Sequence, residues 1–360
     1  MKRYNGEKHT VMFTACCGWP TCGTITSLRN TGTFRVIGVD CSPNPCALNY
    51  VDELIRVPRV DDPSYIDELI DICVRKNVDL LVPLISDEIN VISDNAGRFA
   101  QHGVKVLLSD DGNSLKIANN KMLLQKEIDE AGIEGLMPKS IMVDKDNIED
   151  ALYELGYPGK PVCLKCTDAC GSAGFRIVDD RIAKIAVFAR SRKYRSNPYV
   201  SKKQLMDAIE NIDPSFMLQE YLPGEELGTM CLVDHGRTVY SPSHRNISME
   251  FSTAVYCELV NDEEANRIVR KINKLLNLDG NIGYDFKRDE TGKLRLMEIN
   301  PRISATVSLA AKAGLNLVEL GCLHALGYEI DESIEPEYGL RLMRVYGSLY
   351  EKDGVPYGRM

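Results

Sequence analysis

The segment that decides the fold is residues 282–304, with the sequence IGYDFKRDETGKLRLMEINPRIS. Two short alternating runs flank the turn-forming tetrapeptide DETG at residues 289–292, a pattern typical of an antiparallel hairpin. Side chains alternate along a strand, so Glu298 and Asn300 share one face of the second run.

The first run of this hairpin adds a third polar residue to the same face. If Arg288 pairs with Lys293 across the turn, then Asp285 lies diagonal to Glu298. Carboxylate and amide oxygens in this arrangement suit Mg²⁺, which takes one or two carboxylates and keeps water and phosphate oxygens as its other ligands. The segment therefore predicts a Mg²⁺ site formed by Asp285, Glu298 and Asn300. The alternative is an exposed sheet face that carries polar residues.

The composition is that of an ordinary globular protein. A chain of 360 residues is long enough for two or three packed units. The hydrophobic fraction of 44% and the charged fraction of 26% are typical of soluble domains. The net charge of -9 argues against broad nucleic-acid binding, because such binding needs a basic surface that releases counterions.

The lack of a targeting signal in the sequence and the scattered cysteines favour a cytoplasmic protein. The sequence has no run approaching the roughly 20 apolar residues of a membrane span, and its N-terminus has no signal-peptide pattern. The twelve cysteines have no repeating spacing, which is typical of reduced thiols. The five histidines show no ligand spacing. Whether the N-terminal cysteines bind a metal stays open, namely Cys16, Cys17, Cys22, Cys41 and Cys46.

The N-terminal third has the pattern of a parallel sheet with crossover helices. An apolar run at residues 10–17 is followed by glycines, a helix from about residue 24, and a second strand at 34–40 that ends in an acid. The glycine spacing is not GxGxxG, so a Rossmann-like structural domain is favoured over a dinucleotide site. The alternation continues to about residue 115, with helices at 65–76 and 88–102 and strands at 78–83 and 104–108.

Two lysines and a small-residue loop then indicate phosphate binding. Lys121 lies in the first turn of an amphipathic helix at 119–131, and Lys165 lies on a strand that leads into the loop TDACGSAG at 167–174. Small residues let backbone N–H groups approach an anion. A surface lysine and a flexible hairpin loop are the alternatives. The loop residues expected to contact the anion are Gly171, Ser172 and Gly174.

The segment FMLQEYLPGEE at residues 216–226 reads as a strand that enters a Pro-Gly bend. Backbone groups of Glu220, Tyr221 and Leu222 at the strand end could bind an adenine edge, with Glu226 next in line for the ribose. Upstream, the basic segment at residues 190–203 is either a solvated loop or a lid over an anionic substrate.

Together these motifs resemble the ATP-grasp superfamily, in particular the branch related to the large subunit of carbamoyl phosphate synthetase. The specific part is the hinge EYLPGEE followed by GYDF and MEINPRIS. The resemblance implies an α/β and α+β architecture. This comprises a Rossmann-like pre-ATP-grasp domain at 1–115, a two-lobed ATP-grasp domain at 116–330 with its small lobe at about 135–222, and a C-terminal extension at 331–360.

Carried over to this sequence, the resemblance assigns roles to individual residues. It implies that Lys121 and Lys165 hold the ATP phosphates beneath the loop at 170–174, and that the hinge residues Glu220, Tyr221, Leu222 and Glu226 bind the nucleoside. Arg302 would steady the transferring phosphoryl group, and Arg245 is a weaker candidate for the same role. The implied metal ligands are Asp285, Glu298 and Asn300.

The resemblance also implies the chemistry, which is activation of a carboxylate as an acyl phosphate for attack by an amine or thiol. The cofactors would be ATP and Mg²⁺, with two ions and Mn²⁺ as a substitute, and the partners small-molecule substrates in a homodimer. Three alternatives remain open: a carbamate- or bicarbonate-phosphorylating half-enzyme, a non-catalytic nucleotide-binding regulator, and a dinucleotide-dependent oxidoreductase. Only one ATP-grasp unit is present, and neither the acid nor the nucleophile can be identified from the sequence.

Overall fold

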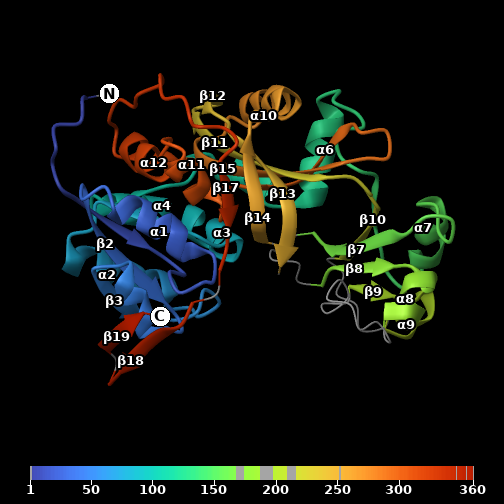
Figure 1. Ribbon diagram of the computed structural model, residues 1–360, viewed down its shortest axis with the longest axis horizontal. Helices are drawn as coiled ribbons and strands as arrows, with labels where there is room; N and C mark the ends of the chain where they lie inside the picture. The colour runs from blue at the N-terminus through green and yellow to red at the C-terminus, as the bar shows by residue number, and fades with distance from the viewer. Residues whose placement is uncertain are drawn as a thin grey trace. The chain divides into compact units, whose positions relative to one another are not determined.

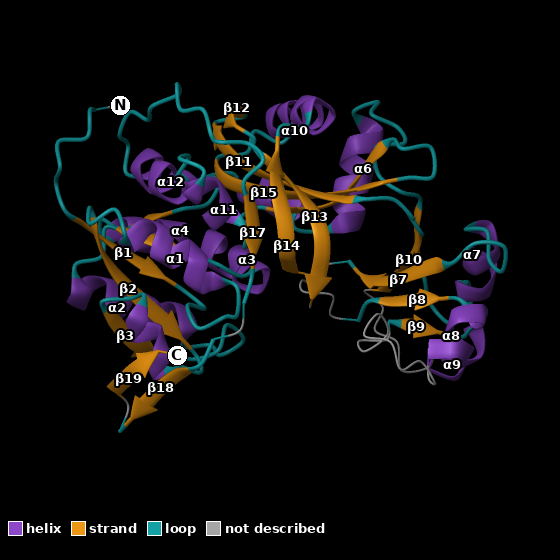
Figure 2. Ribbon diagram, viewed as in Figure 1, coloured by secondary structure: helices purple, strands orange, loops and turns teal. Residues whose placement is uncertain are grey.

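The computed structural model describes residues 2–167, 174–186, 198–208, 216–250, 253–345, 347–353 and 355–359. The chain divides into two compact units (Figures 1 and 2). The first unit comprises Met1–Asn119, Glu226–Asp285 and Glu298–Met360, and the second comprises Asn120–Glu225 and Phe286–Met297. Among the helices of the described ranges, none has both the length and the apolar character that crossing a bilayer requires.

The N-terminal region of the first unit is a parallel sheet, as predicted, with the strand order β3-β2-β1-β4-β5. Its strands are β1 (His9–Phe13), β2 (Phe34–Asp40), β3 (Glu53–Arg56), β4 (Leu80–Val82) and β5 (Lys105–Val106). Its helices are α1 (Thr21–Arg29), η1 (Pro45–Asn49), α2 (Tyr65–Lys76), α3 (Ser86–Asp94), α4 (Ala96–Gln101) and α5 (Gly112–Ala118). The helix predicted at 88–102 is thus two helices, and β3 was not foreseen.

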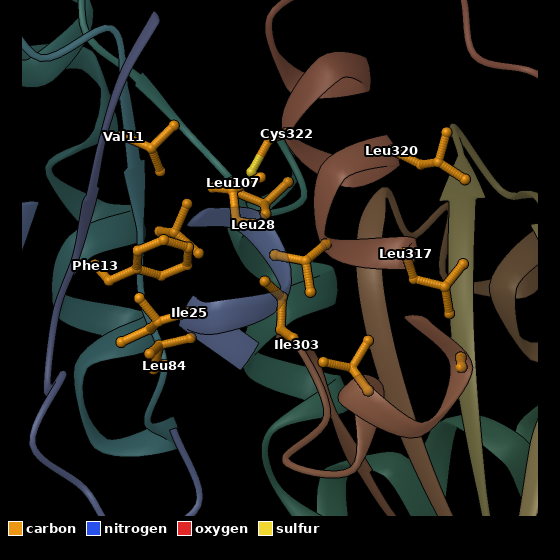
Figure 3. Packing of buried hydrophobic residues seen from close by; sticks show 14 of the residues in the cluster. Val11, Phe13, Ile25, Leu28, Leu84, Leu107, Ile303, Leu317, Leu320 and Cys322 are labelled. Atoms are coloured by element: carbon orange, nitrogen blue, oxygen red, sulfur yellow. The ribbon is translucent and has the colours of Figure 1, made fainter. Parts of the chain in front are cut away.

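Alternation along β1 divides the core between the two faces of this sheet. Val11 and Phe13 belong to a buried cluster that includes Leu28 of α1 and Leu317 of a later helix, α12 (Leu317–Ala325; Figure 3). Met12 points to the other face and joins a second cluster with residues of α2 and α3. Burial on both faces is what a parallel strand requires, and it explains the continuous apolar run in the sequence.

A second, mostly antiparallel sheet has the order β16-β15-β11-β13-β14-β17, and β12 pairs with β11. It belongs to the first unit except for the ends of β15 and β16 within Phe286–Met297. Its strands are β11 (Glu226–Asp234), β12 (Arg237–Tyr240), β13 (Ser243–Glu250), β14 (Thr253–Val260), β15 (Gly280–Arg288), β16 (Leu294–Asn300) and β17 (Arg341–Met343). Its helices are α10 (Glu263–Leu275), α11 (Val307–Lys312) and α12 (Leu317–Ala325). A separate ribbon pairs β18 (Leu349–Lys352) with β19 (Val355–Arg359).

The second unit has its own sheet, with the order β6-β10-β7-β8-β9. Its strands are β6 (Ser140–Met142), β7 (Val162–Cys166), β8 (Arg176–Val178), β9 (Tyr199–Val200) and β10 (Phe216–Glu220). Its helices are α6 (Lys121–Glu130), α7 (Ile148–Glu154), α8 (Asp180–Ala186) and α9 (Lys202–Ala208). A small buried cluster that includes Leu152, Val162 and Leu218 holds helix α7 against the sheet.

The hairpin predicted within residues 282–304 is formed by β15 and β16. Its turn has the Gly292 N–H donating to the Asp289 carbonyl at 3.0 Å, with Gly292 at φ +83°. The Asp289 N–H donates to the Lys293 carbonyl at 2.9 Å, so Asp289 and Lys293 close the hairpin. The assumed pairing of Arg288 with Lys293 was therefore wrong by one residue, because a glycine in the left-handed region adds a bulge at this turn.

Candidate active site

The acidic residues predicted from the hairpin come together in the first unit. Asp285 lies on β15, Glu298 and Asn300 lie on the adjacent strand β16, and Glu226 begins β11 on the other side of β15. The Asn300 amide Nδ2 donates to Asp285 Oδ2 at 2.9 Å. Gly283 faces Asn300, since a Cβ at position 283 would lie 3.5 Å from the Asn300 Cβ.

Arg302 brings a positive charge to this carboxylate cluster, which we define as Asp285, Glu298 and Glu226. Its Nη2 donates to Asn300 Oδ1 at 3.2 Å, and its Nη1 donates to the Ile303 carbonyl at 3.0 Å. The Arg302 Nε is buried and has no hydrogen-bond partner among the described residues. The guanidinium is therefore fixed in place but keeps a donor for an anionic ligand.

The electrostatics of the cluster favour a cation. Burial, followed by the negative charge of Glu298, raises the pKa of Asp285 well above its usual range. The charge of Glu226 acts in the same direction, and the charge of Arg302 opposes it. Carboxylates and an amide oxygen form the donor set that Mg²⁺ prefers, so Asp285, Glu298 and Asn300 fit this ion.

Arg245 lies on β13, which pairs with β11, and its role in the anionic zone stays a prediction. Arg245 is exposed on β13, where it pairs with Leu227 of β11 and Glu258 of β14. Residues that pair across a sheet share a face, and neighbours along a strand point to opposite faces. Arg245 and Glu226 therefore project from opposite faces of the sheet.

In the second unit, two lysines lie close to one buried cysteine. Burial raises the pKa of the Cys163 thiol on β7, and the positive charges of Lys165 and Lys287 partly offset this effect. The Lys165 Nζ lies 5.9 Å from the centroid of the Phe175 ring. Lys287 was missed by the sequence reasoning, although its position two residues after Asp285 on the same strand puts both side chains on one face.

Lys121 begins helix α6, as the sequence predicts. The preceding Asn120 caps the helix by accepting from the N–H groups of Met122 and Leu123, both at 3.1 Å. The Lys121 N–H donates to the carbonyl of Thr167, just before the small-residue loop, at 3.0 Å.

The described end of the small-residue loop is Gly174, and the predicted ligands Gly171 and Ser172 lie outside the described residues, as do 190–197 of the basic segment. Gly174 has φ +70°, and a Cβ there would lie 2.7 Å from the ring of Phe216. Only glycine fits this position, for both conformational and steric reasons.

The predicted adenine hinge follows β10. Leu222 is 2% exposed, and the Tyr221 ring lies 5.8 Å from Lys287 Nζ. Glu220 Oε2 is 3.9 Å from an Arg295 nitrogen, a neighbour that the sequence did not indicate. In the bend, the Gly224 N–H donates to the Arg288 carbonyl at 3.0 Å, and this contact is too close for any side chain at position 224.

The N-terminal cysteines form a separate group near the carboxyl ends of β1 and β2. The sulfur atoms of Cys16 and Cys17 lie 3.8 Å apart, and the Cys17 N–H donates to Asp40 Oδ2 at 2.9 Å. Burial raises the pKa of both thiols. Cys16, Cys17 and Asp40 each offer a ligand atom within 4.8 Å of the others, and a metal ion would have to displace the thiol protons to bind there.

Comparison with known proteins agrees with this picture of the fold. Residues 23–107 match the family of PylC-like N-terminal domains, and residues 213–347 match a family described as ATP-grasp in the biosynthetic pathway with Ter operon. The C-terminal match to an ATP-grasp family and the N-terminal match to PylC-like domains follow one another in the order that the sequence motifs indicated. The predicted recognition and fold class are thereby confirmed.

The sequence is also similar to the carbamoyl phosphate synthase large chain of Thermus thermophilus. The two are 22% identical over 325 residues, which cover 86% of this chain and 29% of that relative. The chain thus spans less than a third of the length of the curated relatives that it matches.

Two solved structures share the fold. The L-amino acid ligase of Bacillus licheniformis has a TM-score of 0.65 at 15% identity, covering 93% of this chain and 78% of that one. The biotin carboxylase domain dimer of the Hydrogenobacter thermophilus 2-oxoglutarate carboxylase, in complex with MgADP, ADP and bicarbonate, also has a TM-score of 0.65. It is 16% identical and covers 89% of this chain and 70% of that one.

Proposed function

We propose that this protein is an ATP- and Mg²⁺-dependent ligase that activates a carboxylate as an acyl phosphate and passes the acyl group to an amine or a similar nucleophile. The observation that supports this most strongly is the carboxylate cluster with Arg302 beside it, within the residues 213–347 that match an ATP-grasp family. The negative charge of Asp285 is unfavourable beside Glu298 and Glu226, and a bound cation would relieve this repulsion.

The proposed roles follow from the chemistry of each side chain. Asp285, Glu298 and Asn300 would hold Mg²⁺, which when bound would neutralise charge on the phosphate oxygens. Arg302, whose Nε has no described partner, would donate to the transferring phosphoryl group.

The remaining cations and the hinge would bind the nucleotide. Lys165 and Lys121 would hold the phosphates, and we add Lys287 to this set because it shares the electrostatic environment of Lys165. The hinge from Glu220 to Leu222 would bind adenine, and Glu226 would lie near the ribose or the metal.

The reaction divides into two displacements. A carboxylate oxygen of the substrate attacks the γ-phosphorus, the bond to the β,γ-bridging oxygen breaks, and ADP leaves. The amine nitrogen then attacks the acyl carbon, phosphate leaves with the C–O bonding pair, and the nitrogen loses a proton. The side chains proposed for the site supply charge and position, so neither step needs a covalent enzyme nucleophile.

A screen for ADP and phosphate release across pairs of carboxylic acids and amines tests this proposal. Release that depends on both an acid and an amine is the expected result. Hydroxylamine in place of the amine should trap the acyl phosphate as a hydroxamate. Release that is independent of any acid would contradict the proposed ligase.

The second candidate is a bicarbonate- or carbamate-phosphorylating enzyme, favoured by the relatives named carbamoyl phosphate synthase large chain. Bicarbonate-dependent ADP release without any organic acid would establish it.

The use of two metal ions, replacement by Mn²⁺, and assembly into a homodimer are further parts of the proposal. Metal titration would test the first two, and light scattering would test the third.

A further inference from the structure

A second polar cluster lies in the first unit, away from the residues assigned to the proposed ligase. It consists of Asp234, His235, Asp279 and His324, and one potential ligand atom of each lies within 4.8 Å of the others. Asp234 ends β11, His235 is in the turn to β12, Asp279 immediately precedes β15, and His324 is in α12. We refer to these four residues as the His-Asp cluster.

The turn holds His235 in a defined position. His235 and Gly236 have φ values of +46° and +81°, and Asp234 pairs with Arg237, so they form the two-residue turn of a tight hairpin. The His235 N–H donates to Asp279 Oδ1 at 2.9 Å, and the Gly236 N–H donates to a neighbouring carbonyl at 2.7 Å. Backbone hydrogen bonds therefore fix the position from which the imidazole extends.

The distances within the cluster are those of preassembled ligands. His324 Nε2 lies 2.9 Å and His235 Nδ1 lies 3.5 Å from Asp279 Oδ1, and His235 Nδ1 is 3.0 Å from Asp234 Oδ1. Nitrogen and oxygen ligands about 2.0–2.1 Å from a tetrahedral zinc ion are roughly 3.3 Å apart. A metal ion could replace the protons that now link these atoms, with only small side-chain movements.

Burial and charge also suit a metal. The His324 side chain is 4% exposed, and its Nδ1 has no hydrogen-bond partner among the described residues. The His235 side chain is 62% exposed, which gives an ion access from solvent. The two carboxylates carry two negative charges, which a divalent cation would balance when both imidazoles bind it through a nitrogen lone pair.

The neighbouring arginine does not block the proposed ligand oxygen. Arg237 Nη2 donates to the other oxygen of Asp234, Oδ2, at 2.9 Å. Glu332 holds the same guanidinium through contacts of 2.7 and 2.8 Å, and this partly offsets its charge. Arg237 therefore orients Asp234 and leaves Oδ1 directed at His235.

We propose that the His-Asp cluster is a structural site for a divalent transition-metal ion of the zinc type, distinct from the Mg²⁺ site of the ligase. Two imidazoles and two carboxylates suit Zn²⁺ or Co²⁺, whereas Mg²⁺ prefers oxygen ligands alone. The ion would join the β11–β12 turn and the start of β15 to α12, three segments far apart in the sequence.

Titration of the full chain with Co²⁺ as a spectroscopic probe tests this site, followed by competition with Zn²⁺. One equivalent should give the intense visible absorption of four-coordinate cobalt, and Zn²⁺ should abolish it. His235→Gln should weaken binding at least tenfold while the exposed side chain leaves folding intact. The matched control His102→Gln changes another exposed histidine and should bind like the parent protein.

The competing outcomes overturn the site in distinct ways. If no four-coordinate spectrum forms, or if His235→Gln binds as tightly as the parent, the four side chains are only a hydrogen-bonded network. A thiolate-to-cobalt charge-transfer band would place the ion at Cys16 and Cys17 instead. Glu298→Gln should keep the cobalt spectrum, so failure of the proposed ligase and failure of this site are separable.

Discussion

Acidification should destabilise the first unit through one buried histidine. His244 is 4% exposed, and its Nδ1 lies 2.8 Å from Asn246 Oδ1, so the neutral ring donates through Nδ1. The other nitrogen, Nε2, faces the backbone of β11, because a Cβ at Gly228 would lie only 2.3 Å from it. Burial lowers the pKa of His244 to about 4, because the site offers little solvation to a charged ring.

The size of the effect follows from linkage. The unfolded chain protonates this histidine near its ordinary pKa of 6.5, whereas the folded chain protonates it only near 4. Between pH 6.5 and pH 4, the unfolded state binds more protons than the folded state. The contribution of His244 to the free energy of unfolding is therefore complete above pH 6.5 and is lost as the pH falls towards 4. At about 1.4 kcal/mol per unit, the difference between the unfolded-state and folded-state pKa of His244 corresponds to about 3 kcal/mol of unfolding free energy.

Urea unfolding monitored by tryptophan fluorescence measures this loss. The sequence contains a single tryptophan, Trp19, and it lies in the first unit, so the signal reports on the unit that contains His244. His244→Gln removes the titrating group and keeps an amide donor for Asn246. We expect this variant to lose about 3 kcal/mol less than the parent between about pH 7 and pH 4. Parallel losses in the two proteins would refute the reasoning.

Three further substitutions test the proposed ligase and its fold. Glu298→Gln should lower ATP turnover at least about 100-fold without changing the circular dichroism spectrum, and unchanged turnover would exclude the metal assignment. Lys287→Met should raise the KM for ATP about tenfold, because one phosphate-binding cation is lost, and an unchanged KM would remove Lys287 from the site. Gly224→Ala should destabilise the protein by about 1–3 kcal/mol, since the added Cβ would contact the Arg288 carbonyl. Gly97→Ala is the matched control for thermal unfolding, because its Cβ would meet no atom within 4 Å.

Side-chain alternation and helical periodicity in the sequence predicted individual strands and helices and the residues that share a strand face. The alternation in residues 282–304 grouped Asp285, Glu298 and Asn300. The turn register was wrong, but Gly283 lies opposite Asn300 and the Asn300 amide reaches Asp285, so the pairing shifts again before the site. The register depended on Gly292 adopting φ +83°, which the alternation of side chains does not encode. The break between α3 and α4 at Asn95 likewise interrupts an amphipathic pattern that continues on both sides of it.

Contacts between distant segments could not be read in this way. The charge of Glu226 raises the pKa of Asp285 because β11 lies beside β15. The neighbourhood of these two strands depends on the order of strands in the sheet. The His-Asp cluster combines three segments whose histidines show no ligand spacing in the sequence. Lys287, in contrast, could have been predicted from the sequence, because it lies two residues after Asp285 on the same strand. Its closeness to Tyr221 of the hinge then indicates the proposed nucleotide contact.

The carboxylate cluster also bears on whether the protein is a catalyst or only a nucleotide-binding regulator. Burial of Asp285 beside Glu298 and Glu226 makes its charged form costly, and Arg302 compensates for only part of this cost. Neutral side chains would make these strands more stable, and a regulator that only binds the nucleotide could use them. A multivalent cation removes the cost when it binds and places charge where phosphoryl transfer needs it. The arrangement therefore favours a site for a cation and its phosphate ligand, because without them the buried charge of Asp285 is only partly compensated.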